Sequence, residues 1–272
     1  MEGFQSGKQP PGLMINPTKP ITPQTTSPVQ LISLLEVPLE QEVCDLDFVL
    51  RQSKAFDTTS KAYGAIVISN PRFQRWMAAT ESDLIHVDGH LDPSRFGKTS
   101  PISYFCANLA RLLEDSPTSI TLHFFCGQHV ASNDGLQGPR GLIRSLLAQL
   151  LRAWPAPILH GVDLAGFTGQ HASIPIEDLC QIFELLLRQI PIHCTIFCII
   201  DDFAQFEKER WDDEYWHVLR MLGTLIVGQE FGIRFLVLIT SSTKSKRLQE
   251  HVPGDLRIQV TDRDQLMGNR RH

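Results

Sequence analysis

The chain has 272 residues, of which 42% are hydrophobic, and its 25 basic and 30 acidic side chains give a net charge of −5. This length and apolar content are enough for one sizeable core with a small helical extension, and the acidic balance argues against a nucleic-acid-binding surface. The six cysteines form no C-x-x-C pair, which argues against a zinc ribbon or a thioredoxin-like site, and most of them lie in apolar runs of a long chain, which argues against a disulfide framework. No run of about 18 apolar residues and no signal-peptide pattern occur, so a cytoplasmic protein without a membrane span is expected.

The first 80 residues are predicted to form two parts. Residues 1–30 are rich in Pro, Thr, Ser and Gln with few large apolar side chains, which predicts a disordered leader. Within it, Ser27-Pro28 is typical of a helix cap followed by proline at the first helical position. Helical spacing of apolar residues then predicts a helical extension over residues 31–80. Its helices are expected at about 39–56, 59–69 and 73–79.

From residue 81 onward, apolar strands alternate with amphipathic helices. Strands are predicted at 84–88, 119–126, 194–200, 234–240 and 256–260. Helices are predicted at 101–114, 139–153, 176–189 and 213–227. This alternation predicts an α/β core over residues 81–262, with a parallel sheet covered by helices on both faces, and a tail over 263–272. Ligands of such sheets bind at the carboxyl ends of the strands, so the residues that follow each strand are the candidates for function.

The segment after the first predicted strand contains Gly97-Lys98-Thr99-Ser100. It matches the end of the P-loop pattern G-x-x-x-x-G-K-[ST]. The glycines of this pattern let backbone N–H groups curl around phosphates, its lysine neutralises phosphate charge, and its hydroxyl binds Mg²⁺. Gly97, Lys98, Thr99 and Ser100 are therefore candidate nucleotide-binding residues, with Thr99 also a candidate ligand of Mg²⁺.

Two features of the same segment depart from the pattern. Asp92 stands where the leading glycine is expected, and a side chain resists the backbone conformation needed there. Ser100-Pro101 predicts a helix that starts three residues after Lys98, whereas the lysine of a working P-loop already opens the helix. A polar strand-to-helix loop that happens to contain G-K-T remains the alternative.

Two acids, Asp201 and Asp202, end the third predicted strand. An apolar strand followed by two acids is the Walker B pattern, in which the first acid holds Mg²⁺ and the second orients or deprotonates the attacking water. Asp201 is thus a candidate metal ligand and Asp202 a candidate catalytic acid, with a solvated strand end as the alternative. Thr240 and Ser241 end the fourth strand, where a hydroxyl can sense a γ-phosphate or simply form a turn.

Five segments in this order resemble fungal NACHT/STAND-type P-loop NTPase domains, similar to the nephrocystin-like N-terminal modules of fungal signalling proteins. The resemblance covers roughly residues 70–262. The segments are SPISYFCANLARLL (100–113), LHFFCGQH (122–129), GPRGLIRSLLAQLL (138–151), FCIIDDFAQFE (197–207) and FLVLITSS (235–242). The resemblance implies a five-stranded sheet of order 5-1-4-3-2 and binding of ATP or GTP with Mg²⁺. It also implies phosphate and metal roles for Lys98, Thr99 and Asp201, a catalytic role for Asp202, and a nucleotide-dependent switch.

The chain departs from this family at three places. Asp92 replaces the leading glycine, Ser242 stands where an arginine is often found, and only about ten residues follow the fifth strand, where relatives continue with a helical lid. Two functions therefore stay open. One is a nucleotide-binding signalling or assembly domain with weak or absent hydrolysis, and the other is a non-enzymatic interaction scaffold that no longer binds nucleotide. Both imply protein partners, with no nucleic acid and no membrane.

Overall fold

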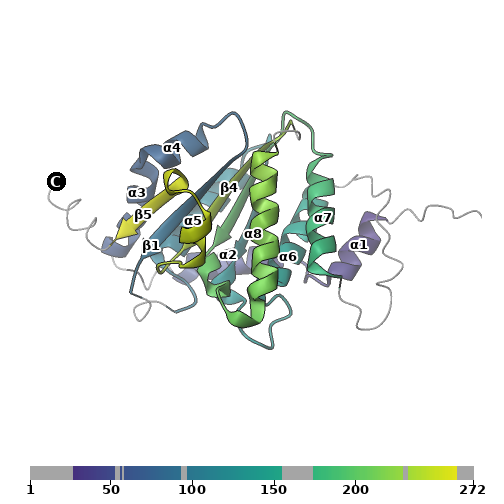
Figure 1. Cartoon of the computed structure of the whole chain (residues 1–272), viewed down its shortest axis with the longest axis horizontal. Coiled ribbons are helices and arrows are strands. Elements are labelled where there is room, and N and C mark those ends of the chain that lie inside the picture. The colour runs from purple at the N-terminus through teal and green to yellow at the C-terminus, as the bar shows by residue number, and fades with distance from the viewer. Residues whose placement is uncertain are drawn as a thin grey trace, which may run out of the picture.

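A five-stranded, all-parallel sheet forms the middle layer of the molecule (Figure 1), and its strand order is β2-β3-β4-β1-β5. The computed structural model describes residues 27–52, 56, 58–92, 97–154, 174–228 and 232–261. The strands are β1 (Asp83–His90), β2 (Ser119–Phe125), β3 (Thr195–Asp201), β4 (Arg234–Ser241) and β5 (Arg257–Thr261). From the opposite edge the order is 5-1-4-3-2, so the predicted sheet is confirmed.

Helices cover both faces of this sheet. They are α1 (Pro28–Leu35), α2 (Gln41–Gln52), α3 (Thr58–Ser69), α4 (Pro71–Met77), α5 (Pro101–Glu114), α6 (Gly138–Ala153), α7 (Ile176–Leu187), α8 (Asp212–Val227) and α9 (Arg247–His251). The predicted helical extension corresponds to α1–α4. Helix α1 begins inside the segment predicted as a leader, because Ser27 caps it: the Ser27 Oγ accepts a hydrogen bond of 3.2 Å from the Gln30 N–H. Residues 1–26 and the predicted tail lie outside the described residues.

Two hydrophobic clusters lie on opposite faces of the sheet. On one face, α2, α3, α4 and α5 pack against alternate residues of β1, β3, β4 and β5, such as Ile85, Phe197 and Leu236. On the other face, α1, α6, α7, α8 and α9 pack against residues of the intervening positions, such as Ile196 and Phe235. Successive strand residues thus enter different cores, which explains the near-continuous apolar strands in the sequence. The described part of the chain contains no helix long and apolar enough to cross a membrane.

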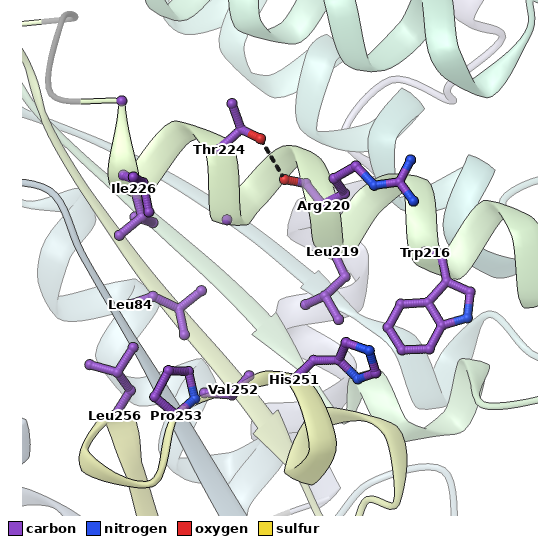
Figure 2. A pocket seen from close by; sticks show the side chains of 13 residues that line it. Leu84, Trp216, Leu219, Arg220, Thr224, Ile226, His251, Val252, Pro253 and Leu256 are labelled. Atoms are coloured by element: carbon purple, nitrogen blue, oxygen red, sulfur yellow. Dashed lines mark hydrogen bonds between the residues drawn. The ribbon is translucent and has the colours of Figure 1, made fainter.

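A groove of about 870 Å³ lies between α8 and the segment that joins α9 to β5. Figure 2 shows Leu219 and Ile226 of α8 on one side of it, facing Val252, Pro253 and Leu256 on the other. Arg220 and His251 are the two titratable residues among those that line the groove, and most of the others are apolar. The groove shares no lining residue with the G-K-T segment or with the acids at the end of β3, so it is separate from the candidate nucleotide site.

Candidate functional site

The G-K-T segment lies between β1 and α5, at the carboxyl edge of the sheet. Gly97 and Lys98 are exposed, whereas Thr99 and Ser100 are buried. Residues 93–96 of the same loop lie outside the described residues. Helix α5 begins at Pro101, so the helix start predicted three residues after Lys98 is confirmed.

A capping box closes the N-terminus of α5. The Ser103 N–H donates to the Ser100 Oγ at 3.1 Å, and the Ser100 N–H donates to the Ser103 Oγ at 3.0 Å. The Tyr104 N–H bonds to the Ser100 carbonyl at 3.0 Å, and Pro101 has no N–H to offer. A phosphate at a helix N-terminus is held by free first-turn amides. In α5 the Ser103 amide already donates to Ser100, and Pro101 has no amide N–H.

At Gly89, near the end of β1, the packing leaves no room for a side chain. A Cβ on Gly89 would lie 2.3 Å from the Ile102 Cδ1 and 2.9 Å from the Ser241 carbonyl oxygen, so α5 packs directly on the end of β1. Seven residues, 90–96, separate Gly89 from Gly97, compared with four in the P-loop pattern. The sequence places this glycine directly after the apolar run of β1, but nothing in it indicated that α5 would pack so closely there.

A second glycine supports the G-K-T segment from the other side. Gly127 lies in the short 3₁₀ helix Cys126–Gln128 that follows β2, and a Cβ on it would lie 2.4 Å from the carbonyl oxygen of Lys98. Only glycine allows the backbone of the two segments to approach so closely. Nothing in the sequence indicated this contact, because the two segments are 29 positions apart (127 − 98).

Asp201 lies at the end of β3, beneath the first two turns of α5. Its Oδ1 accepts a hydrogen bond of 2.8 Å from the Thr240 hydroxyl, and Ser103 and Cys106 of α5 also donate to its carboxylate. Burial and the neighbouring charge of Asp202 raise the pKa of Asp201 to about 7, although these hydrogen bonds act in the opposite direction. The structure therefore brings the predicted metal ligand against the helix that follows the G-K-T segment.

Asp202 has a structural environment that its predicted catalytic role did not anticipate. It adopts the left-handed conformation, with φ 53°, and its N–H donates to the Thr240 Oγ1 at 2.9 Å. Its carboxylate accepts from the Ser242 N–H at 2.8 Å, the Ser242 hydroxyl at 2.7 Å and the Gln205 side-chain amide at 2.9 Å. The two donors from Ser242 tie the end of β3 to the end of β4, and together the three donors take up most of the acceptor sites of this carboxylate.

The two hydroxyl residues at the end of β4 point to opposite faces of the sheet. Thr240 lies on the α5 face and bonds to Asp201, whereas the Ser241 hydroxyl lies 3.0 Å from the His86 Nε2 on the α8 face. Burial lowers the pKa of His86 to about 4, against the opposing charge of Asp88. Of the two predicted γ-phosphate sensors, only Thr240 therefore lies next to the acids of β3.

No group of three or more His, Cys, Asp or Glu side chains in the described ranges is arranged to hold a metal ion by itself. His123 and His129 have other partners. The His123 Nε2 lies 3.1 Å from the Glu42 carbonyl, and the two ring nitrogens of His129 each lie 3.0 Å from a carboxylate, that of Asp45 or that of Asp134. A metal at Asp201 would thus need further ligands from a bound molecule.

The sheet order, the G-K-T segment between β1 and a helix, and the acid at the end of β3 are the features of a P-loop NTPase-like domain. Residues 63–241 match the family model described as nephrocystin 3, N-terminal, and the chain belongs to this family.

Solved structures of the ORC2 protein of Aeropyrum pernix are also similar. The ADP form has 13% sequence identity and a TM-score of 0.39, over 78% of this chain and 50% of that chain. The form described as ADPNP-ADP complexes has 14% identity and a TM-score of 0.38, over 74% of this chain and 46% of that chain. This chain thus spans about half the length of those ORC2 chains. No curated protein matches the chain.

Proposed function

We propose that this domain binds a nucleoside triphosphate with Mg²⁺ between Lys98 and Asp201 and hydrolyses it weakly or not at all. In this proposal it is a nucleotide-dependent switch in signalling or assembly, and it acts on a protein partner. The observation that carries the proposal is the position of Asp201, which lies under the same helix, α5, whose N-terminus follows the G-K-T segment.

Each proposed binding residue has a property that suits its role. The Lys98 side chain is exposed and can approach the β- and γ-phosphates. Mg²⁺ is commonly held by one or two carboxylates together with phosphate oxygens, so Asp201 and the Thr99 hydroxyl would suffice once the Ser103 and Cys106 donors turn away from the Asp201 carboxylate. Because burial raises the pKa of Asp201 to about 7, a bound cation would displace a proton from this carboxyl near neutral pH.

Weak hydrolysis is inferred from Asp202. Its carboxylate already accepts three hydrogen bonds from Ser242 and Gln205, and a general base must instead be within hydrogen-bond reach of the attacking water. The proposed role of Asp202 is therefore to fix the ends of β3 and β4 around the site.

Thermal unfolding with and without nucleotide tests the proposal. A ligand at 100 times its Kd stabilises the folded state by about 2.7 kcal/mol, so Mg-ATP or Mg-GTP should raise the Tm by several degrees. Lys98→Ala should abolish the shift. Lys246→Ala, which removes another exposed lysine beside α9 on the opposite face of the sheet, should retain it. Phosphate release that Asp202→Asn removes would show instead that Asp202 is a catalytic base.

The alternative function is an interaction scaffold that keeps the fold without the ligand. The capping box of Ser100 and Ser103 and the presence of Asp92 at the leading glycine position favour it, since both differ from a working phosphate loop. Under this alternative, millimolar ATP or GTP with Mg²⁺ leaves the Tm of the wild-type chain unchanged.

A further inference from the structure

Consecutive residues after β2 contact the G-K-T segment and helix α2. These residues, Cys126 to His129, are called the 126–129 turn below. Gly127 packs against the Lys98 carbonyl, where a Cβ would lie 2.4 Å away. The next residue, Gln128, donates its side-chain amide to the Asp45 carbonyl of α2 at 3.1 Å. The ring of His129 then lies 3.0 Å from the Asp45 carboxylate.

The 126–129 turn is held from the inside of the molecule and has little freedom to absorb a displacement. Cys126, Gly127 and His129 are buried, and the His129 ring stacks on Phe124 with 4.6 Å between ring centroids. Phe124 in turn contacts Phe206, in the 3₁₀ helix that directly follows Asp202. Close-packed interiors transmit strain because they contain little empty space, so a shift of the Lys98 peptide acts on the whole turn.

Helix α2 depends on polar contacts as well as on its apolar side. Leu46 and Val49 enter the core, and Glu42 forms an ion pair with Arg152. Asp45, which is 8% exposed, provides the contacts with the 126–129 turn. Val43, at 45% exposed, and Phe48, at 39% exposed, are apolar side chains of the same helix that remain outside the core.

We infer that the 126–129 turn couples occupancy of the phosphate loop to the docking of α2. This inference rests on the proposed nucleotide binding. A phosphate draws the amides of its loop toward itself, and the Lys98 carbonyl packs so close to Gly127 that no side chain fits between them, so a displaced Lys98 peptide meets the turn. The loop and Asp45 therefore contact the same turn from its two sides. Bound nucleotide then changes the free energy with which α2 docks, and docking of α2 changes the nucleotide affinity by the same factor.

The reciprocal effect gives the test. Mg-ATP and Mg-GTP affinities are measured by titration calorimetry for the wild-type chain, for Asp45→Asn and for Gln128→Ala. Asp45→Asn removes the charge that pairs with His129, Gln128→Ala removes the hydrogen bond to the Asp45 carbonyl, and neither substitution touches the loop. Asp47→Asn, on the same helix and more exposed, is the matched control. The expected result is a change in affinity of about fivefold or more for the first two variants and none for the control.

Amide hydrogen exchange of α2 provides a second readout for the same proteins. Saturating Mg-ATP should alter the exchange of residues 41–52 in the wild-type chain, and the alteration should be smaller in Asp45→Asn. The coupling is overturned if the wild-type chain binds nucleotide, Asp45→Asn and Gln128→Ala bind it as tightly as Asp47→Asn does, and nucleotide leaves the exchange of α2 unchanged. Nucleotide binding itself would stand in that case. If the wild-type chain binds no nucleotide, both proposals fail.

Discussion

Replacing Asp201 by asparagine should make the stability of the protein less dependent on pH. Asp201 is 2% exposed, and burial raises its pKa from 3.8 to about 7. The folded state then binds this proton more tightly than the unfolded state does. The free energy of unfolding therefore falls as pH rises from about 4 to about 7 and is constant above that range. Ionising a carboxyl with these two pKa values costs about 4 kcal/mol of stability at neutral pH and above.

Asparagine carries no charge to bury and keeps an oxygen that can accept the hydrogen bond from Thr240. Urea unfolding of the wild-type chain and of Asp201→Asn at intervals between pH 4.5 and pH 8 measures the effect. The stability of Asp201→Asn relative to the wild-type chain should increase toward pH 7, by at most about 4 kcal/mol. Asp255→Asn, at an exposed position, is the control and should follow the wild-type curve. Parallel curves for the wild-type chain and Asp201→Asn would refute the reasoning about this carboxyl.

Two further predictions concern packing and a buried histidine. Gly89→Ala should lower the free energy of unfolding, measured in urea, by about 1–3 kcal/mol, because its Cβ would lie 2.3 Å from the Ile102 side chain. Gly223→Ala is the control: this position on α8 has open space around it, so alanine should be neutral or stabilising by up to about 1 kcal/mol. Equal effects of the two alanines would contradict the close approach of α5 to β1. Burial lowers the pKa of His129, but the hydrogen bond and charge of Asp45 outweigh it and, with a neighbouring carboxylate, raise this pKa above 6.5. The resulting stability is complete below pH 6.5 and is lost as pH rises through the folded-state pKa. The protection of α2 amides, corrected for the intrinsic exchange rate at each pH, should therefore fall as pH rises above 6.5, and Asp45→Asn should weaken this dependence.

The architecture could be predicted because the sequence signals for it are local. The apolar runs of the strands and the helical spacing between them depend on neighbouring residues alone, and every predicted core strand and helix lies within a few residues of an observed one. Ser27 with Pro28 and Ser100 with Pro101 likewise predicted the starts of α1 and α5, since a cap and its helix are adjacent in sequence. The short helix α9 was missed because its five residues are too few to show a period.

The details of the candidate site depend on contacts between distant segments, and these were not predictable. Gly89 and Gly127 are constrained by α5 and by the Lys98 peptide, which no pattern of neighbouring residues records. The position of Asp202 as a bridge to Ser242 depends on the pairing of β3 with β4 and on its left-handed backbone. Sequence spacing predicted which residue types lie at the carboxyl edge, and the packing decides which of their oxygens and amides remain available.

The central claim is that Lys98 and Asp201 hold one nucleotide together. It is tested most directly by titrating Mg-ATP and Mg-GTP into the wild-type chain, Lys98→Ala and Asp201→Asn at pH 8, after circular dichroism has shown that all three are folded. The account predicts saturable binding by the wild-type chain, a loss of affinity in Lys98→Ala with and without Mg²⁺, and a loss in Asp201→Asn that appears only when Mg²⁺ is present. Absence of wild-type binding, or the same affinity in all three proteins, would contradict it.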